Sequence, residues 1–119
     1  MLFSIELYET TDGRAVVEEE LDVIERQAPM LHALVVAGLN KLRRRELHRL
    51  PLTAPLGDGL FELRVGGKDI ARAVWFFRSS ARIVVVRCFV KKSQKTPQRE
   101  LELARTRMAD YMARYPDSR

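Results

Sequence analysis

The sequence is poor in the residues that build disulfides and metal sites. Its 119 residues include one cysteine, Cys88, and two histidines, His32 and His48. One cysteine cannot form an internal disulfide, and a cysteine-based zinc site needs several. The two histidines are far apart and lack a cysteine or carboxylate cluster at ligand spacing. We therefore expect no metal and no cofactor.

Long apolar runs are also missing. No run approaches the roughly 18 apolar residues that a membrane helix requires. Residues 1–6 carry neither a basic segment nor a long apolar segment, so they do not resemble a signal peptide. We expect a cytoplasmic protein with no membrane partner.

The chain is rich in apolar residues and in positive charge. Apolar residues make up 46% of the sequence, enough for a core, and the length suits a single domain over residues 1–119. The net charge of +5 is uneven. Residues 1–60 hold 7 basic and 10 acidic side chains, whereas residues 61–119 hold 14 basic and 6 acidic ones. We expect a polyanion to bind the basic second half.

The first half predicts one strand and two helices. Residues 2–8 are rich in β-formers and partly alternate, as a strand does. Two apolar stripes at helical spacing follow and meet near Pro29, which predicts an αα-hairpin that covers one face of a sheet. Glu18, Glu19 and Glu20 are expected on the outer side of the first helix. Residues 50–59 contain two prolines and two glycines and predict a loop.

The second half predicts an antiparallel meander and a last helix. The three strands are expected at about 60–65, 69–77 and 82–90, joined by turns. Thr96 can cap the helix that follows, with Pro97 at its first position. The order β-α-α-β-β-β-α indicates an α+β fold, a mostly antiparallel twisted sheet with helices packed on it. Cys88 alternates with valines, which indicates a buried thiol that is not a nucleophile.

Three arginines lie within the predicted strands. Alternation places Arg64 on a face with Leu60 and Glu62. It places Arg72 with Ile70, Val74 and Phe76, and Arg87 with Ile83, Val85 and Phe89. An unpaired arginine among aliphatic neighbours is costly to bury. Each is therefore either paired, with Glu62 as one candidate partner, or part of a face that meets an anion.

A basic string leaves the last strand and enters the last helix. Its lysines are Lys91, Lys92 and Lys95. Backbone N–H groups at a helix N-terminus favour phosphate, and lysines add charge that contacts a phosphate chain. A solvated basic loop is the alternative. Arg99, on the helix, either extends this footprint or only solvates the helix.

Several of these strings resemble those of a known family. FELR at 61–64, RAVWFF at 72–77 and FVKKSQKTP at 89–97 are similar to the phage-derived HigB-like toxins of the RelE/ParE superfamily. The similarity covers roughly residues 56–115. Its most specific part is the FVKKxQKTP string, placed after a strand and before a helix.

The resemblance implies a toxin of a type II toxin–antitoxin pair. Members of that family have a compact sheet with helices on one side and a basic active face. They typically cleave mRNA, often on the translating ribosome and without a metal. The implied partner is a helix-turn-helix, HigA-like antitoxin.

The resemblance also assigns roles to the polar residues. Arg72 matches the arginine placed at the scissile phosphate, the lysines match the basic string, and Glu62 and Arg64 match the E-L-R motif. In such a reaction the RNA 2′-OH attacks the adjacent phosphate, an arginine clamps that phosphate, and Glu62 or a lysine with a lowered pKa acts as base. The expected catalytic residues are Arg72, Lys91, Lys92 and Glu62. The expected RNA-binding residues are Arg64, Arg87, Lys95 and Arg99.

Two other functions fit parts of the pattern. One is a non-enzymatic, ParE-like toxin that binds gyrase. The other is an inactive prophage-derived protein that only binds its antitoxin or RNA. The lysine string favours the RNA-cleaving toxin, because a pure protein binder does not need a phosphate-binding strand end.

Overall fold

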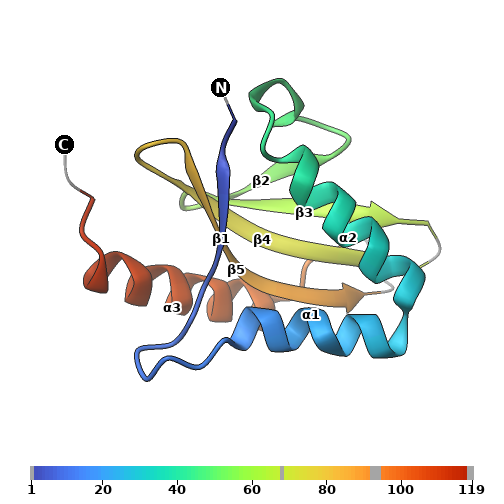
Figure 1. Ribbon diagram of the computed structural model, residues 1–119, viewed down its shortest axis with the longest axis horizontal. Coiled ribbons are helices and arrows are strands. Elements are labelled where there is room, and N and C mark those ends of the chain that lie inside the picture. Colours follow the sequence, from blue (N-terminus) through green and yellow to red (C-terminus); the bar gives the residue numbers. More distant parts are fainter. Residues whose placement is uncertain (1, 68, 92–94, 118–119) are drawn as a thin grey trace.

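A five-stranded sheet organises the chain in the computed structural model, which describes residues 2–67, 69–91 and 95–117 (Figure 1). Its spatial order is β1-β5-β4-β3-β2, with β1 parallel to β5 and every other neighbouring pair antiparallel. The strands are β1 (Ser4–Leu7), β2 (Thr53–Gly57), β3 (Leu60–Gly66), β4 (Ile70–Arg78) and β5 (Arg82–Lys91). The helices are α1 (Val16–Gln27), α2 (Pro29–Lys41), the 3-10 turn η1 (Arg45–Leu47) and α3 (Gln98–Arg114). The predicted α+β class is confirmed.

The meander strands β3, β4 and β5 begin and end close to their predicted positions. The β3–β4 connection depends on Gly66, whose φ is +110°. A Cβ at this position would lie 2.3 Å from the Asp69 carbonyl oxygen, so only glycine fits the turn.

The loop predicted at residues 50–59 is wrong in part, because β2 lies within it and pairs with β3. Pro55 is tolerated there because β2 is an edge strand, where one N–H group needs no partner strand. The Thr53 side chain is buried and holds the strand in place. Its Oγ1 accepts a hydrogen bond from Trp75 Nε1 at 3.1 Å and donates one to the Glu62 carbonyl oxygen at 2.8 Å.

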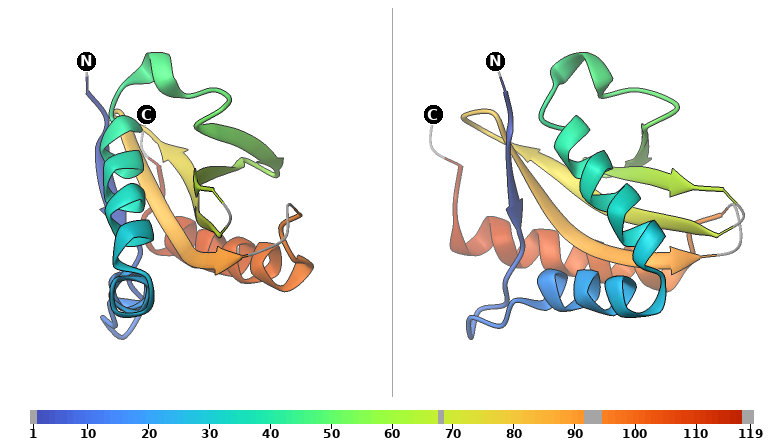
Figure 2. Two further views of the ribbon diagram at one scale, coloured as in Figure 1. Left: turned by 90° about the vertical axis from the view of Figure 1, so that its right-hand side faces the viewer. Right: turned by 45° about the vertical axis from the view of Figure 1, so that its right-hand side comes forward.

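Helices cover both faces of the sheet (Figure 2). Gly38 of α2 packs so closely on the face of Leu63 that a Cβ would lie 3.0 Å from a Leu63 methyl carbon. Tyr111 of α3 packs on the opposite face, with its ring centroid 5.6 Å from that of Phe76. The one-sided arrangement implied by the family resemblance is therefore wrong. Trp75 and Phe76 point to opposite faces and are both fully buried, so the sheet has a core on each side.

A β-bulge at Val86 changes the facing of the second half of β5. Trp75 pairs with Val85 and Val74 pairs with Arg87, so Val86 is an extra residue between them. The prediction that Arg87 shares a face with Val85 is therefore wrong, because one extra residue reverses the alternation. Arg87 instead faces α3.

The described part of the chain contains no helix with the length and apolar character needed to cross a membrane.

Candidate nucleic-acid interface

The strand register brings the three predicted arginines onto one face of the sheet. Arg64 lies opposite Arg72, and Arg72 lies opposite Phe89 on the next strand. The bulge places Arg87 on this same face, two residues before Phe89. The face is the one that α3 covers.

Arg72 and Glu62 form a buried pair on this face. Both side chains are 0% exposed, and Arg72 Nη1 lies 3.5 Å from Glu62 Oε2. Arg72 Nη1 donates a hydrogen bond to Thr96 Oγ1 at 2.7 Å, and the Thr96 hydroxyl donates to Glu62 Oε2. A buried cation is thereby matched by a buried anion and a hydroxyl, as its desolvation requires.

Thr96 does not cap α3, and this part of the prediction is wrong. The helix begins at Gln98, with Pro97 in the cap position and no side-chain hydrogen bond to the first turn. The physical reason is that the Thr96 hydroxyl is already engaged between Arg72 and Glu62.

Arg64 is the more open member of the group. Its side chain is 39% exposed, and its Nε donates to Glu62 Oε1 at 2.7 Å. One buried carboxylate therefore orients two guanidinium groups, one inside the protein and one at its surface.

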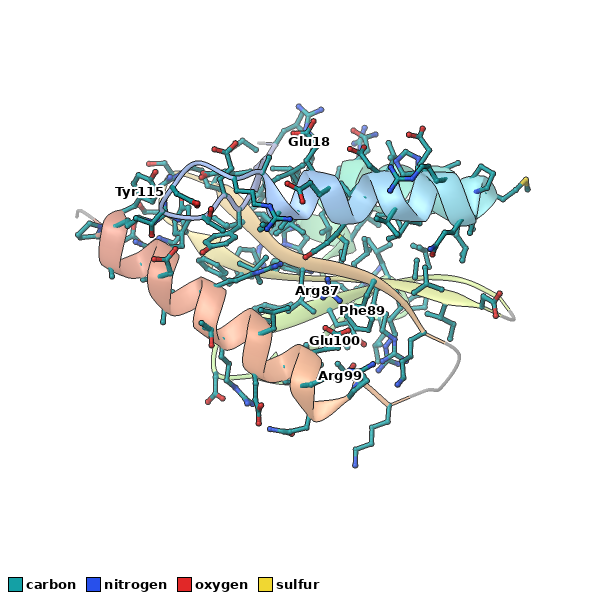
Figure 3. The ribbon with its side chains drawn as sticks, turned by 90° about the horizontal axis from the view of Figure 1, so that it is seen from below. Glu18, Arg87, Phe89, Arg99, Glu100 and Tyr115 are labelled. Atoms are coloured by element: carbon teal, nitrogen blue, oxygen red, sulfur yellow. The ribbon has the colours of Figure 1, made fainter. Side chains whose placement is uncertain are left out.

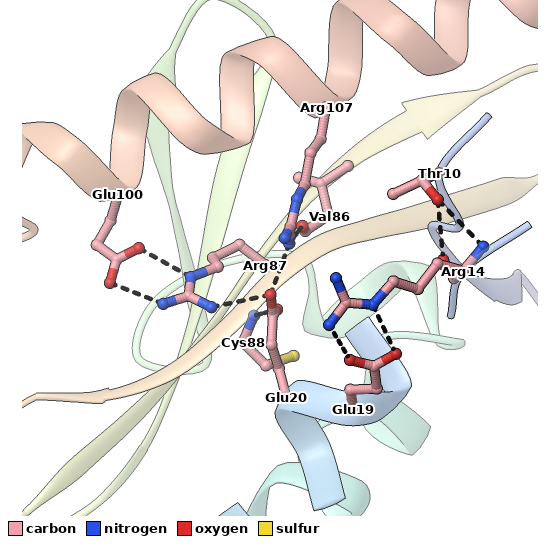
Figure 4. A network of polar contacts seen from close by, with 9 residues as sticks. All are labelled: Thr10, Arg14, Glu19, Glu20, Val86, Arg87, Cys88, Glu100 and Arg107. Atoms are coloured by element: carbon pink, nitrogen blue, oxygen red, sulfur yellow. Dashed lines mark hydrogen bonds and ion pairs between the residues drawn. The ribbon is translucent and has the colours of Figure 1, made fainter. Parts of the chain in front are cut away.

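Arg87 is held by two carboxylates (Figure 4). Its Nε and Nη2 donate to the two Glu100 oxygens at 2.8 and 3.1 Å, and its Nη1 lies 2.8 Å from Glu20 Oε2. Burial by itself lowers the pKa of Arg87, but the hydrogen bonds and charges of Glu100 and Glu20 outweigh it and raise that pKa. Arg87 thus stays charged, and its charge is compensated within the protein.

Glu20 is a site residue that the sequence pattern missed. Its Oε1 accepts the Cys88 backbone N–H at 3.0 Å, and its Oε2 accepts a hydrogen bond from Arg107 Nη1 at 2.8 Å. Arg107 Nη1 also donates to the Val86 carbonyl oxygen at the bulge. The expected outer position of Glu20 is therefore wrong. Its sequence signal is the spacing of three or four residues from the buried Val16, Val17 and Ile24, which places it at the border of the apolar stripe.

Cys88 is buried, as predicted. Its side chain lies in the core at 2% exposure. Burial, and to a smaller extent the Glu20 charge, raises the pKa of the thiol far above its usual range. The sulfur is therefore protonated at physiological pH and is not a nucleophile.

Basic side chains lie where β5 ends and α3 begins. Lys91 is half-buried at the end of β5, Lys95 is exposed three residues before α3, and Arg99 is exposed in the first turn of α3. Arg99 lies beside Glu100 in the first turn of this helix (Figure 3). Arg64 lies on the same face of the sheet, two strands from Lys91, and its row is two residues from the row of Gly66, Ile70 and Lys91. Its partner Glu62 also accepts a hydrogen bond from Thr96, the neighbour of Lys95. We call Arg64, Lys91, Lys95 and Arg99 the cationic end. Lys92, also predicted as catalytic, lies outside the described residues.

Within residues 2–67, 69–91 and 95–117, no three or more histidine, cysteine, aspartate or glutamate side chains are grouped so that they could hold a metal ion.

Comparison with protein families gives a direct match. The model of the family described as phage-derived protein Gp49-like (DUF891) matches residues 12–109, which is most of the chain. This chain belongs to the Gp49-like family. A comparison with curated proteins finds no match. The Gp49-like family is associated with RelE and toxin-like proteins. The matched region of this Gp49-like protein includes Glu20, Glu62, Arg72, Thr96 and the cationic end.

Proposed function

We propose that this Gp49-like protein is the toxin of a type II toxin–antitoxin system. Its proposed activity is metal-independent cleavage of mRNA on the translating ribosome, as in the HigB-like toxins it resembles. The observation that carries the proposal is the cationic end. Four basic side chains, from β3, β5, the segment before α3 and the first turn of α3, lie at this end of the sheet face, beside helix N–H groups that favour phosphate.

The proposed reaction needs only the RNA and protein side chains. The 2′-oxygen loses its proton and forms a bond to the adjacent phosphorus, while the bond from phosphorus to the 5′-oxygen breaks. The departing 5′-oxygen takes up a proton, and a cyclic phosphate remains. Cations that hold the phosphate in line stabilise the negative charge that develops on its oxygens.

Arg72 and Glu62 are fully buried, so other side chains must contact the RNA. A phosphate cannot contact a side chain with no exposed surface unless the protein rearranges. Both Glu62 oxygens already accept hydrogen bonds, one from Arg64 and one from Thr96. We therefore place Arg64 at the phosphate, where its planar guanidinium can bind two oxygens. Arg72 and Glu62 support it from beneath.

The test is to express the protein and map the 5′ ends of cellular mRNA. We expect growth arrest and new 5′ ends inside coding frames of ribosome-engaged messages. Arg64→Ala is expected to abolish both while the circular dichroism spectrum stays unchanged. Arg43→Ala, which removes another exposed arginine beyond α2, is the matched control and is expected to cleave normally.

Two results would contradict the proposal. Arrest accompanied by DNA damage signalling and no new mRNA ends would indicate a gyrase-binding toxin. A protein that causes neither arrest nor cleavage would indicate an inactive binding protein.

We propose a helix-turn-helix antitoxin as the partner, because an exposed cationic end requires a cover when the toxin is at rest. Co-expression of a helix-turn-helix protein encoded beside this one is expected to relieve the arrest in the same experiment. Persistent arrest despite a stable complex would contradict inhibition by that partner.

A further inference from the structure

The Thr96 hydroxyl lies at the centre of a buried polar chain. It accepts a hydrogen bond from Arg72 Nη1 at 2.7 Å and donates one to Glu62 Oε2. The other Glu62 oxygen accepts from Arg64 Nε at 2.7 Å. The order Arg72–Thr96–Glu62–Arg64 therefore runs from the interior to the cationic end.

The Thr96 hydroxyl connects Arg72 and Glu62, whose charged groups do not lie at hydrogen-bond distance from each other. Arg72 Nη1 and Glu62 Oε2 are 3.5 Å apart, which exceeds the usual length of an N–H···O hydrogen bond. The hydroxyl bridges this gap with one hydrogen bond to each group. It thereby leaves the Glu62 carboxylate turned so that its second oxygen faces Arg64.

Thr96 also joins two elements of the proposed site. It lies two residues before α3, between the exposed Lys95 and the helix that carries Arg99, while Glu62 and Arg72 belong to β3 and β4. The hydroxyl therefore ties the start of α3 to the strand row that carries Arg64.

We propose that Thr96 is a positioning residue for RNA cleavage. Its hydroxyl holds the Glu62 carboxylate in the orientation that aims Arg64, and it fixes Lys95 and Arg99 over the same phosphate. This role rests on the proposed function. Thr96 acts through these residues and makes no contact with RNA.

Loss of the hydroxyl has a specific consequence. Without it, Arg72 and Glu62 close the 3.5 Å gap, and the carboxylate turns away from Arg64. The cationic end keeps all its charges, so attraction for RNA remains. Its geometry at the phosphate is lost, and an error of about 1 Å there can lower a rate by about 10²-fold. The effect therefore falls on kcat and leaves KM nearly unchanged.

The test compares Thr96→Val, Thr96→Ala and Thr96→Ser in the full chain, with mRNA on programmed ribosomes and with free mRNA as substrates. We expect kcat to fall by about 10- to 100-fold for the valine and alanine variants, with KM changed less than about threefold. Serine, which keeps the hydroxyl, is expected to restore most of kcat. If the valine variant does not fold, the alanine variant carries the test.

Thr53→Val is the matched control. It also removes a buried hydroxyl that bridges two groups, one of them the Glu62 carbonyl oxygen, but its side chain lies with Trp75 on the opposite face. We expect it to lower Tm while kcat stays normal. Equal kcat losses for Thr53→Val and Thr96→Val would reduce Thr96 to a structural residue and overturn the inference.

The same experiment distinguishes failure of the positioning role of Thr96 from failure of the proposed RNA cleavage. If wild-type protein cleaves RNA and the hydroxyl-free Thr96 variants cleave equally well, the inference is wrong and the function stands. If these variants lose RNA binding and kcat together, Thr96 builds the binding surface and the positioning role is wrong. If wild-type protein cleaves neither substrate, the proposed function fails, and the positioning role fails with it.

Discussion

At the scale of single residues, Glu62 has the largest influence on the candidate site. Its side chain has no exposed surface, yet it lies between the Arg72 and Arg64 guanidiniums and accepts the Thr96 hydroxyl. Removing one member of a buried ion pair leaves the other charge desolvated and uncompensated. The carboxylate is therefore needed for stability as well as for orientation.

We expect Glu62→Gln to lower the free energy of unfolding by about 3 kcal/mol, because the amide keeps the shape but not the charge that Arg72 requires. Urea unfolding followed by circular dichroism measures the change. Glu19→Gln is the control, since Glu19 pairs with Arg14 at the surface. Its effect is expected to be much smaller, because solvent screens exposed pairs. Equal losses for the two variants would contradict the buried-pair interpretation.

At the scale of elements, side chains hold the last helix against parts of the chain that are distant in sequence. Asp110 of α3 accepts hydrogen bonds from Tyr8, Thr11 and Arg114. Tyr8 and Thr11 belong to the connection between β1 and α1. These hydrogen bonds fix the position of α3 along the sheet face, with the start of the helix at the cationic end.

The hydrogen bonds of Asp110 predict a pH dependence of stability. The hydrogen bond from Tyr8, helped by Arg114 and Thr11, lowers the pKa of Asp110 below its ordinary value of 3.8. A lowered pKa in the folded state stabilises the fold above that ordinary value, and the contribution disappears as pH falls through the folded-state pKa. We expect Asp110→Asn to have a lower Tm than wild type at pH 6.

The difference in Tm between wild type and Asp110→Asn is expected to shrink as the pH falls below 3.8. Tyr8→Phe, which removes the largest cause of the shift, should reproduce part of this behaviour. A Tm difference that stays constant or grows between pH 6 and pH 3 would contradict the assigned role of Asp110.

At the scale of the whole molecule, only part of the excess of basic side chains in residues 61–119 is available to a polyanion. Arg72 and Arg87 contribute to the charge count but are balanced by Glu62, Glu20 and Glu100 inside the fold. The cationic end combines strand and helix charges at one edge of the molecule. The polyanion footprint is therefore smaller than the excess of basic residues in 61–119 indicates.

We expect the salt dependence of RNA binding to locate this footprint. Removing two phosphate contacts with the double variant Lys95→Ala/Arg99→Ala should reduce the slope of log K against log salt concentration by about 1.4, because each contact with a single strand contributes about 0.7. Arg43→Ala/Arg45→Ala removes the same charge from exposed residues beyond α2 and should leave the slope unchanged. Fluorescence anisotropy with a labelled single-stranded RNA, over a series of salt concentrations, measures both. Equal slope changes would mean that binding follows net charge alone.

The local structure of this protein follows from its sequence pattern. Alternation and turn residues predicted β3, β4 and β5 closely. Helical spacing predicted an apolar stripe on the first helix, and its members Val17, Leu21 and Ile24 are buried. These features depend on residues that are close in the sequence, so hydrophobic periodicity and turn residues are enough to predict them. The basic string and its place between a strand and a helix are local in the same way.

Tertiary structure decided which charges pair and which are enclosed. One extra residue at Val86 turned Arg87 toward α3, and no local pattern marks that bulge. The partnerships of Glu20 with Arg87 and of Thr96 with Glu62 join residues 67 and 34 positions apart. Such pairs form because a buried charge must be compensated wherever the fold brings a partner near it. That requirement acts in space, so only the folded chain shows that Arg72 is enclosed while Arg64, bound to the same carboxylate, is partly exposed.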